Sequence, residues 1–440
     1  MTLSFVASSP AASSPAASSL AASPLAASLE RAESLNAIAS MDMAGIETHG
    51  GPLVLVKDNI ATRGMPLTAG SPFFADVVAK TDATAVRLLR AAGGNPAVRT
   101  TLHELALGIT GVNAWSGPIL NPFCASRVAG GSSGGSAAAL AVGLGDLSLV
   151  TDTGGSARIP AAHCGVIGFR PTTGRYPADG VVHLSPSRDT IGLMARDLRW
   201  IIWADRLLSG ETTLPPSQTA PVIGIMEAST LDTLEQPIAM AYRRLCDRLL
   251  HAGYSLKPVS LEHVARLDGQ CGMTIAAHET FHALSAACAT LRESPFDALV
   301  AATASADVAA VLQGCAEQAL AAPRDYTQAI GVGWPALHAA FRAVFAGVSV
   351  LLTPTTPFLP PAVAQTGVVT PQGENLPVFP AYSRFTRPDS MAGLPSLSFP
   401  VEAGQHALPM GMMLSAPRWQ DNALLRIVQD ILHTLERSAG

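Results

Sequence analysis

Short runs of large aliphatic residues alternate with helical stripes along most of the chain. Leu53–Val56 is a run of four aliphatic residues, which predicts a strand buried on both faces. A helical stripe over residues 81–92 follows, ended by Gly93-Gly94, and Val98 marks a second strand. Strand, helix and strand make a crossover unit, and such units build parallel sheets.

The same alternation continues to the C-terminus. Further strands are predicted over residues 147–150, 166–169, 221–226 and 348–352 and near Leu397 and Met410, and helices over 136–142, 235–251 and 424–435. Leu29, Ala32, Leu35 and Ile38 predict one more helix near the N-terminus. The expected fold class is α/β, with a large mixed, mostly parallel twisted β-sheet surrounded by helices.

The chain divides into a tail and one large domain. Residues 1–28 are almost only Ala, Ser and Pro, which predicts a flexible tail. Because no linker divides the rest convincingly, we expect a single domain over residues 29–440. Its catalytic core is expected over about residues 50–200, and Ala-rich helices over about 230–345 would cover and shape a pocket.

Composition and charge narrow the function classes. Apolar residues make up 48% of the chain and charged residues 14%, which indicates a large buried core. A net charge of −5 without a basic cluster argues against nucleic acid, and no stretch is apolar enough to span a membrane. The six cysteines have no CxxC spacing, which is typical of reduced thiols in a cytoplasmic protein. No His, Cys or Asp cluster has metal-ligand spacing, so we expect no metal or cofactor.

Two glycine-rich loops each carry a serine. Ser132 lies in Gly-Gly-Ser-Ser-Gly-Gly-Ser at 130–136, and Ser156 lies in Thr-Asp-Thr-Gly-Gly-Ser at 151–156. Glycine allows positive φ and close approach, so two such loops at strand and helix ends predict a site. We interpret the two serines as catalytic partners.

A serine nucleophile needs a base. The chain has only three lysines against 25 arginines, and Lys57 directly follows the buried run Leu53–Val56. Burial disfavours the charged ammonium, so the pKa of Lys57 should fall toward a range in which the amine can accept a proton. The alternative is a structural ion pair with Asp58 at the strand end.

The second loop also offers hydrogen-bond donors. Consecutive backbone N–H groups of Thr153, Gly154, Gly155 and Ser156 could converge on an oxyanion. Asp152 and Arg158 flank these residues and are expected to brace the loop as an ion pair.

These motifs together resemble the amidase signature family of Ser-cisSer-Lys hydrolases, from about Leu29 to the C-terminus. The resemblance rests on Val-Lys-Asp-Asn-Ile around Lys57, the two serine loops, Leu-Leu-Thr-Pro-Thr-Thr-Pro at 351–357 and Gly-Leu-Pro-Ser at 393–396. It implies that Ser156 is the nucleophile, Lys57 the general base, and Ser132 a bridging serine after a cis peptide at Gly131, with Ser133 in support. Asp389 and Ser390 depart from the family, in which many members carry Phe-Asn.

The resemblance also implies a small-molecule amide substrate, and we expect a monomer or homodimer. The stretch at 170–177 and Arg188–Gly192 look most like hydrolases of aryl-alkyl primary amides; anilides, esters and carbamates use the same acyl chemistry and stay open. The covering helices contain candidate pocket residues, namely His278, Glu279, His282, Trp334 and Phe341.

Three other readings fit part of the sequence. Gly130–Gly134 matches the G-x-S-x-G elbow of α/β-hydrolase esterases, with Ser132 as nucleophile, but no hydrophobic strand precedes it. A nucleotide-binding P-loop would need Lys after its last glycine, where the chain has Ser136. The glutamine-hydrolysing subunit of a tRNA-dependent amidotransferase has the same family motifs and stays an alternative.

Overall fold

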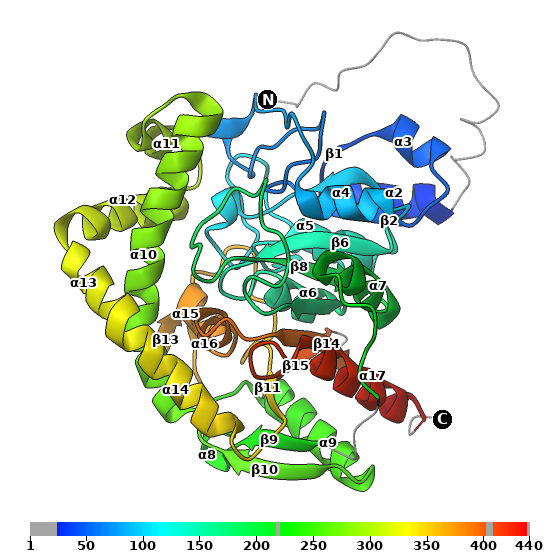
Figure 1. Ribbon diagram of the computed structural model, residues 1–440, viewed down its shortest axis with the longest axis vertical. Helices are drawn as coiled ribbons and strands as arrows, with labels where there is room; N and C mark the ends of the chain where they lie inside the picture. Colours follow the sequence, from blue (N-terminus) through cyan, green and yellow to red (C-terminus); the bar gives the residue numbers. More distant parts are fainter. Residues whose placement is uncertain (1–23, 217–220, 402–407, 438–440) are drawn as a thin grey trace.

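One large sheet runs through the molecule and separates groups of helices (Figure 1). The computed structural model describes residues 24–216, 221–401 and 408–437. Within them, eleven strands form the sheet in the order β1 (Ile38–Met41), β3 (Asn95–Thr100), β2 (Leu53–Lys57), β6 (Leu147–Asp152), β8 (Thr190–Ala195), β7 (Ile167–Arg170), β14 (Ser396–Val401), β15 (Met410–Ser415), β11 (Val350–Pro354), β9 (Val222–Met226) and β10 (Ser255–Val259). Two hairpins lie outside it, formed by β4 (Leu120–Asn121) with β5 (Cys124–Val128) and β12 (Gly367–Val369) with β13 (Asn375–Pro377).

The helices lie around this sheet. They are α2 (Pro24–Ser34), α3 (Met43–Thr48), α4 (Thr84–Ala91), α5 (Gly134–Ala141), α6 (Arg158–Cys164), α7 (Leu198–Ser209), α8 (Ala228–Leu231), α9 (Gln236–His251), α10 (Glu262–Arg292), α11 (Phe296–Ala302), α12 (Ala306–Ala321), α13 (Pro323–Gln328), α14 (Trp334–Phe345), α15 (Val378–Tyr382), α16 (Thr386–Met391) and α17 (Asp421–Arg437). Figure 1 shows α10 to α14 gathered along one side of the molecule, with α7 and α17 on the other.

The large mixed sheet expected from the sequence is confirmed, although most of its described strand pairs are antiparallel, and its parallel pairs fall into two groups. Strands β3, β2 and β6 run parallel to one another, and so do β11, β9 and β10. The strands between these groups pair antiparallel. Parallel pairing is interrupted there because, for example, residues 171–189 connect β7 to β8 without a crossover helix.

Close packing places the first serine loop against the sheet. Every residue of α5 from Gly134 to Leu140 is buried. A Cβ atom at Gly135 would lie 2.6 Å from the Ala37 carbonyl oxygen, so this position requires glycine. The small residues of α5 thus bring Ser132, just before the helix, close to β2 and β6.

The N-terminal prediction was partly wrong. The expected helix over Leu29–Ile38 ends at Ser34, because Asn36 takes a left-handed φ of 57°, and Ile38 begins β1. Residues 1–23 of the tail expected over 1–28 lie outside the described residues. Its last residues belong to α2, where Leu25 packs with Leu29 against the core around α5.

Candidate active site

Lys57 and Ser132 meet inside the protein. Lys57 is the last residue of β2, between the parallel strands β3 and β6, and it has no exposed surface. Its Nζ lies 2.7 Å from Ser132 Oγ and 2.8 Å from Thr151 Oγ1. Burial lowers the pKa of Lys57 to about 7, although the negative charges of Asp152 and Asp189 oppose the shift. A large fraction of this lysine is therefore a neutral amine near neutral pH.

Tight backbone contacts hold Ser132. The Gly131–Ser132 peptide bond is cis, as the resemblance implied. A Cβ atom at Gly131 would lie 2.9 Å from the backbone nitrogen of Gly111, so only glycine fits there. The Ser132 carbonyl accepts a hydrogen bond of 3.1 Å from the His103 N–H, and the Ser133 hydroxyl points to the Thr151 carbonyl at 3.5 Å.

Ser156 lies in the turn between β6 and α6. It is 7% exposed, whereas Ser132 is fully buried. Within the described residues its hydroxyl makes no hydrogen bond, so the contact expected between Ser156 and Ser132 is not made in this structure. Ser156 is thus the more accessible of the two serines.

The Asp152 carboxylate organises the loop that carries Ser156. It accepts hydrogen bonds from the Gly155 N–H at 2.9 Å and from the Ala157 N–H at 3.0 Å. The ion pair predicted with Arg158 is present, with Nη2 at 3.0 Å from Oδ1, and Arg170 Nη1 lies 3.3 Å from the same oxygen. Burial raises the pKa of Asp152, but the two guanidinium groups outweigh it and hold this pKa well below its usual range. Asp152 is therefore charged, and it fixes the turn.

The set of oxyanion donors expected from the sequence needs a correction. The Gly155 N–H is already bonded to Asp152, because the turn directs this amide back toward β6. By contrast, the amides of Thr153, Gly154 and Ser156 donate to no other protein group in the described part of the chain. Asp189 further holds this segment, since its Oδ1 accepts a 2.6 Å hydrogen bond from the Thr153 hydroxyl.

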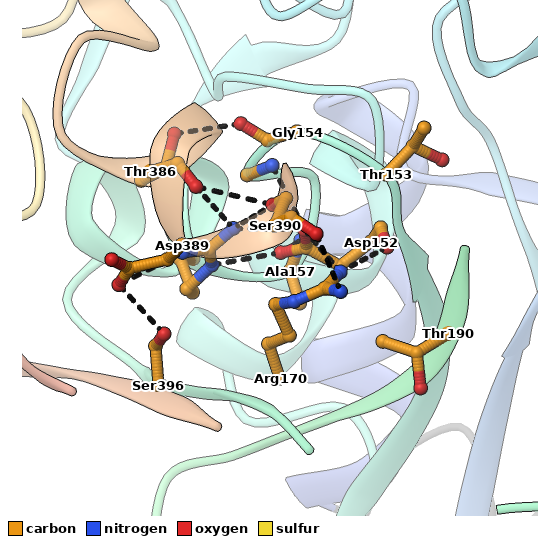
Figure 2. A network of polar contacts seen from close by, with 12 residues as sticks. Asp152, Thr153, Gly154, Ala157, Arg170, Thr190, Thr386, Asp389, Ser390 and Ser396 are labelled. Carbon is orange, nitrogen blue, oxygen red and sulfur yellow. Dashed lines mark hydrogen bonds and ion pairs between the residues drawn. The ribbon is translucent and has the colours of Figure 1, made fainter. Parts of the chain in front are cut away.

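Helix α16 supports the same loop from the far end of the sequence (Figure 2). The Thr386 hydroxyl donates to the Gly154 carbonyl at 2.7 Å. Arg158 Nη2 donates to the Thr386 carbonyl at 3.0 Å and to Ser390 Oγ at 2.6 Å. Ser390 Oγ also lies 3.2 Å from Asp152 Oδ1. The Ser156 loop is thus joined to α16 through its backbone and through its central ion pair.

The candidate pocket residues on the covering helices form a separate set of contacts. Glu279 accepts hydrogen bonds from the hydroxyls of Ser185 and Ser187, at 2.6 and 2.9 Å, and of Tyr326, at 3.2 Å. His278 stacks on Tyr326, and His282 lies beside His278. Trp334 donates to the Met391 carbonyl at the end of α16, and Phe341 is buried. The structure brings none of these side chains into contact with Ser156.

The described residues contain neither a metal-binding cluster nor a membrane-spanning helix. No group of three or more His, Cys, Asp and Glu side chains there could hold a metal ion. None of the helices described is both long and apolar enough to cross a membrane.

Comparison with known proteins gives the family. The family model described as Amidase matches residues 10–425. The chain belongs to the amidase family. This amidase is 33% identical over 421 residues to an indoleacetamide hydrolase of Agrobacterium vitis, covering 90% of this chain and 89% of the relative. It is 32% identical over 444 residues to a mandelamide hydrolase of Pseudomonas putida, covering 92% and 85%.

A solved structure agrees with this assignment. A crystal structure of an amidase superposes on the chain with a TM-score of 0.81 and 30% identity, over 94% of this chain and 95% of the other. The chain is therefore a hydrolase that acts on the C–N bonds of amides.

Sequence reasoning missed several residues of the candidate site. Thr151 and Asp189 were not assigned, although Thr151 contacts Lys57 and Asp189 holds Thr153. Thr151 could have been found, since it directly precedes Asp152 at the end of β6. Asp189 lies in the stretch Arg188–Gly192, which resembles relatives without indicating its role, and Thr386 carries no local signal, because each meets the loop only through the folded chain.

Proposed function

We propose that the amidase hydrolyses uncharged aryl-alkyl primary amides through an acyl-enzyme on Ser156, with Lys57 as general base and Ser132 as the bridging serine. The observation that carries this proposal is the buried 2.7 Å contact between Lys57 Nζ and Ser132 Oγ, made by a lysine whose pKa is lowered to about 7. An amine that is partly neutral at working pH can accept a proton, which an ordinary lysine does poorly.

The proposed reaction moves one proton along the three side chains. Neutral Lys57 takes the proton of Ser132 while Ser132 takes that of Ser156, and Ser156 Oγ bonds to the carbonyl carbon. The proton returns through Ser132 to the leaving nitrogen as the C–N bond breaks, which releases ammonia from a primary amide. Water then attacks the acyl-enzyme by the same proton path and releases the carboxylic acid. The first transfer requires a rotation of the Ser156 hydroxyl toward Ser132, since no bond joins them here.

The oxyanion would be held by backbone donors. We assign this role to the amides of Thr153, Gly154 and Ser156 and leave out that of Gly155, which serves Asp152. Removal of one oxyanion donor typically slows an enzyme by about 10²–10³-fold. The contacts that set this loop, from Asp152, Asp189 and Thr386, are therefore part of the proposed mechanism.

Relatives support an aryl-alkyl substrate. The two curated relatives are named for indoleacetamide and mandelamide, each an aromatic ring one carbon away from a primary carboxamide. We propose the same class here, with aryl esters and carbamates as weaker substrates of the same acyl chemistry. We also propose that the protein works in the cytoplasm as a monomer or homodimer, without nucleic acid or a metal. Its six cysteines are unpaired, which fits a reducing compartment.

The test uses the purified full chain with indole-3-acetamide, phenylacetamide, mandelamide, an anilide, a p-nitrophenyl ester and a small carbamate. We expect ammonia release from the primary amides, unchanged by EDTA. A fluorophosphonate should label Ser156, and Ser156→Ala should lose labelling and at least about 10³-fold in kcat/KM. Ser126→Ala, an exposed serine on β5, is the matched control and should behave like the parent.

Other outcomes would favour the alternatives. A fluorophosphonate adduct on Ser132 would support the esterase elbow and contradict our assignment, although Ser132 is fully buried. Glutamine hydrolysis only in the presence of partner subunits, with no turnover of aryl amides, would support the amidotransferase subunit instead.

A further inference from the structure

His183 lies in the loop between β7 and β8, next to the segment that carries the proposed oxyanion donors. The loop ends at Asp189, which directly precedes β8. Because Thr190 pairs with Asp152 in the antiparallel ladder of β8 and β6, Asp189 falls opposite Thr153 just past its end. Asp189 Oδ1 accordingly accepts the 2.6 Å hydrogen bond from the Thr153 hydroxyl. The loop thus holds the proposed oxyanion segment through one carboxylate.

The other oxygen of Asp189 binds the loop itself. Oδ2 accepts hydrogen bonds from the N–H groups of Leu184 and Ser185, at 2.8 and 3.0 Å, and lies 3.1 Å from Nδ1 of His183. Burial raises the pKa of Asp189, but the hydrogen bonds from His183 and Thr153 outweigh it and lower this pKa, so the carboxylate is ionised. Of the four groups bonded to Asp189, His183 is the one that can carry a charge.

The contacts of His183 indicate that both of its ring nitrogens carry a proton. Nδ1 faces the Asp189 carboxylate, and Nε2 lies 2.9 Å from the carbonyl oxygen of Ala178. An ionised carboxylate and a carbonyl can only accept hydrogen bonds, whereas a neutral imidazole has one donor and one acceptor nitrogen. Both bonds can therefore exist together only if the ring is an imidazolium. In agreement, the hydrogen bond to Asp189 raises the pKa of His183, although burial opposes this shift.

The pair of His183 and Asp189 lies close to Lys57. Both residues line one small cavity together with Thr151, whose Oγ1 lies 2.8 Å from Lys57 Nζ. Burial lowers the pKa of Lys57, and the negative charge of Asp189 opposes this shift. A cation bonded to Asp189 offsets that negative charge, so it favours the neutral amine.

Other charges near this pair do not replace His183. Asp152 also acts on the lysine, but two guanidinium groups already bind its carboxylate. Arg170 and Arg188 act on Asp189 electrostatically, yet neither donates a hydrogen bond to its carboxylate in the described part of the chain. Within that part, His183 is therefore the cation in direct contact with Asp189.

We propose that His183 is a positioning residue of the proposed reaction: its imidazolium fixes the Asp189 carboxylate against Thr153 and offsets the negative charge of Asp189 near Lys57. This role of His183 rests on the proposed function of Lys57 as general base. Without the cation, the charge of Asp189 would favour the protonated lysine. The neutral base would then form only at a higher pH.

The first measurement is the pH profile of kcat/KM for phenylacetamide in the parent and in variants. His183→Gln, which can donate to Asp189 but carries no charge, should move the midpoint of the acid limb upward by about half a pH unit. Asp189→Asn, which removes the anion, should move it downward. His183→Lys keeps a cation at a side chain that is 32% exposed, and it should return the midpoint to the parent value. His251→Gln, at an exposed histidine on α9, is the control and should shift nothing.

The second measurement needs no activity. NMR of the full chain with ¹⁵N-labelled histidine rings reports the protonation of each ring, and the signal that is absent from His183→Gln belongs to His183. We expect both of its nitrogens to carry a proton at pH 7, above the ~6.5 at which a free histidine is half protonated.

The two measurements separate the role of His183 from that of Lys57. A neutral His183 ring at pH 7, or an acid limb that stays in place in His183→Gln, would overturn the role of His183 and leave Lys57 as the base. A parent without any acid limb would overturn the proposed base and the role of His183 together.

Discussion

Lys57 is a basic side chain that the fold keeps away from water. The folded protein holds its pKa at about 7, against 10.5 for an ordinary lysine, so between these pH values the folded state binds fewer protons than the unfolded chain. This group therefore makes the free energy of unfolding rise with pH from about 7 to about 10.5. Below pH 7 the buried lysine is charged, and it lowers the free energy of unfolding by its full amount. The residue that the proposed mechanism needs most is also one that destabilises the fold.

Replacing Lys57 should separate activity from stability. Lys57→Met should lower kcat/KM by about 10³-fold, in the range of a lost general base. The same change removes a buried charge, so the variant should gain stability relative to the parent at pH 6, and the gain should shrink by pH 9. Urea unfolding at the two pH values measures this, with Lys80→Met, an exposed lysine, as the control. A gain that does not depend on pH would contradict the low pKa.

The same titration should appear in the rate. Because the base must be neutral, kcat/KM for phenylacetamide should fall as the pH drops below about 7 and level off above it. Phenylacetamide has no group that titrates near pH 7, so this fall in kcat/KM would come from a group of the enzyme. A flat profile from pH 6 to 9 would contradict the assignment of Lys57 as the base.

At the scale of elements, α16 supports the loop that carries Ser156. Thr386→Val removes the hydroxyl that holds the Gly154 carbonyl at 2.7 Å, so the neighbouring donors lose their alignment. A hydrogen bond of about 1 kcal/mol predicts a fall in kcat of roughly fivefold, with KM within about twofold. Thr386→Ser should recover the rate, and Thr327→Val on α13 should have none of these effects. A change in KM alone would instead indicate a role in binding substrate.

Local patterns account for much of the fold and for part of the site. A buried aliphatic run and a glycine loop mark Lys57 and Ser156 as candidates, whose roles stay predictions, and β2, β6 and α5 formed as predicted. The end of the N-terminal helix was missed because a left-handed Asn36 breaks a stripe that continues past it. The hydrogen bond from the Gly155 N–H to Asp152 could not be predicted, because the residue types do not determine the direction in which one N–H group points. Asp389 and Ser390 stand out in the sequence only because many family members carry Phe-Asn at these positions.

For the whole molecule, the segment 210–216 is the place to test whether one domain or two are present. Strands from before and after this segment belong to one sheet, because β7 pairs with β14. Arg158 also donates a hydrogen bond to Ser390 across the same division. We therefore propose a single domain and expect that cutting a protease site inserted between Thr213 and Leu214 leaves two fragments that elute together with most of the activity. Size-exclusion chromatography followed by a denaturing gel measures this. Fragments that part without denaturant would indicate two separate lobes.

Arg158 and Ser390, which share a hydrogen bond, lie 232 residues apart in the sequence. Arg158 is therefore synthesised long before its partner. A ribosome that has already made Lys57, Ser132 and Ser156 must still add more than half of the chain before α16 exists. Until then the loop of Ser156 lacks the helix that holds its carbonyl and its ion pair. The nascent chain therefore carries its proposed nucleophile without its support, and we expect hydrolysis to stay weak until α16 has been synthesised and folded.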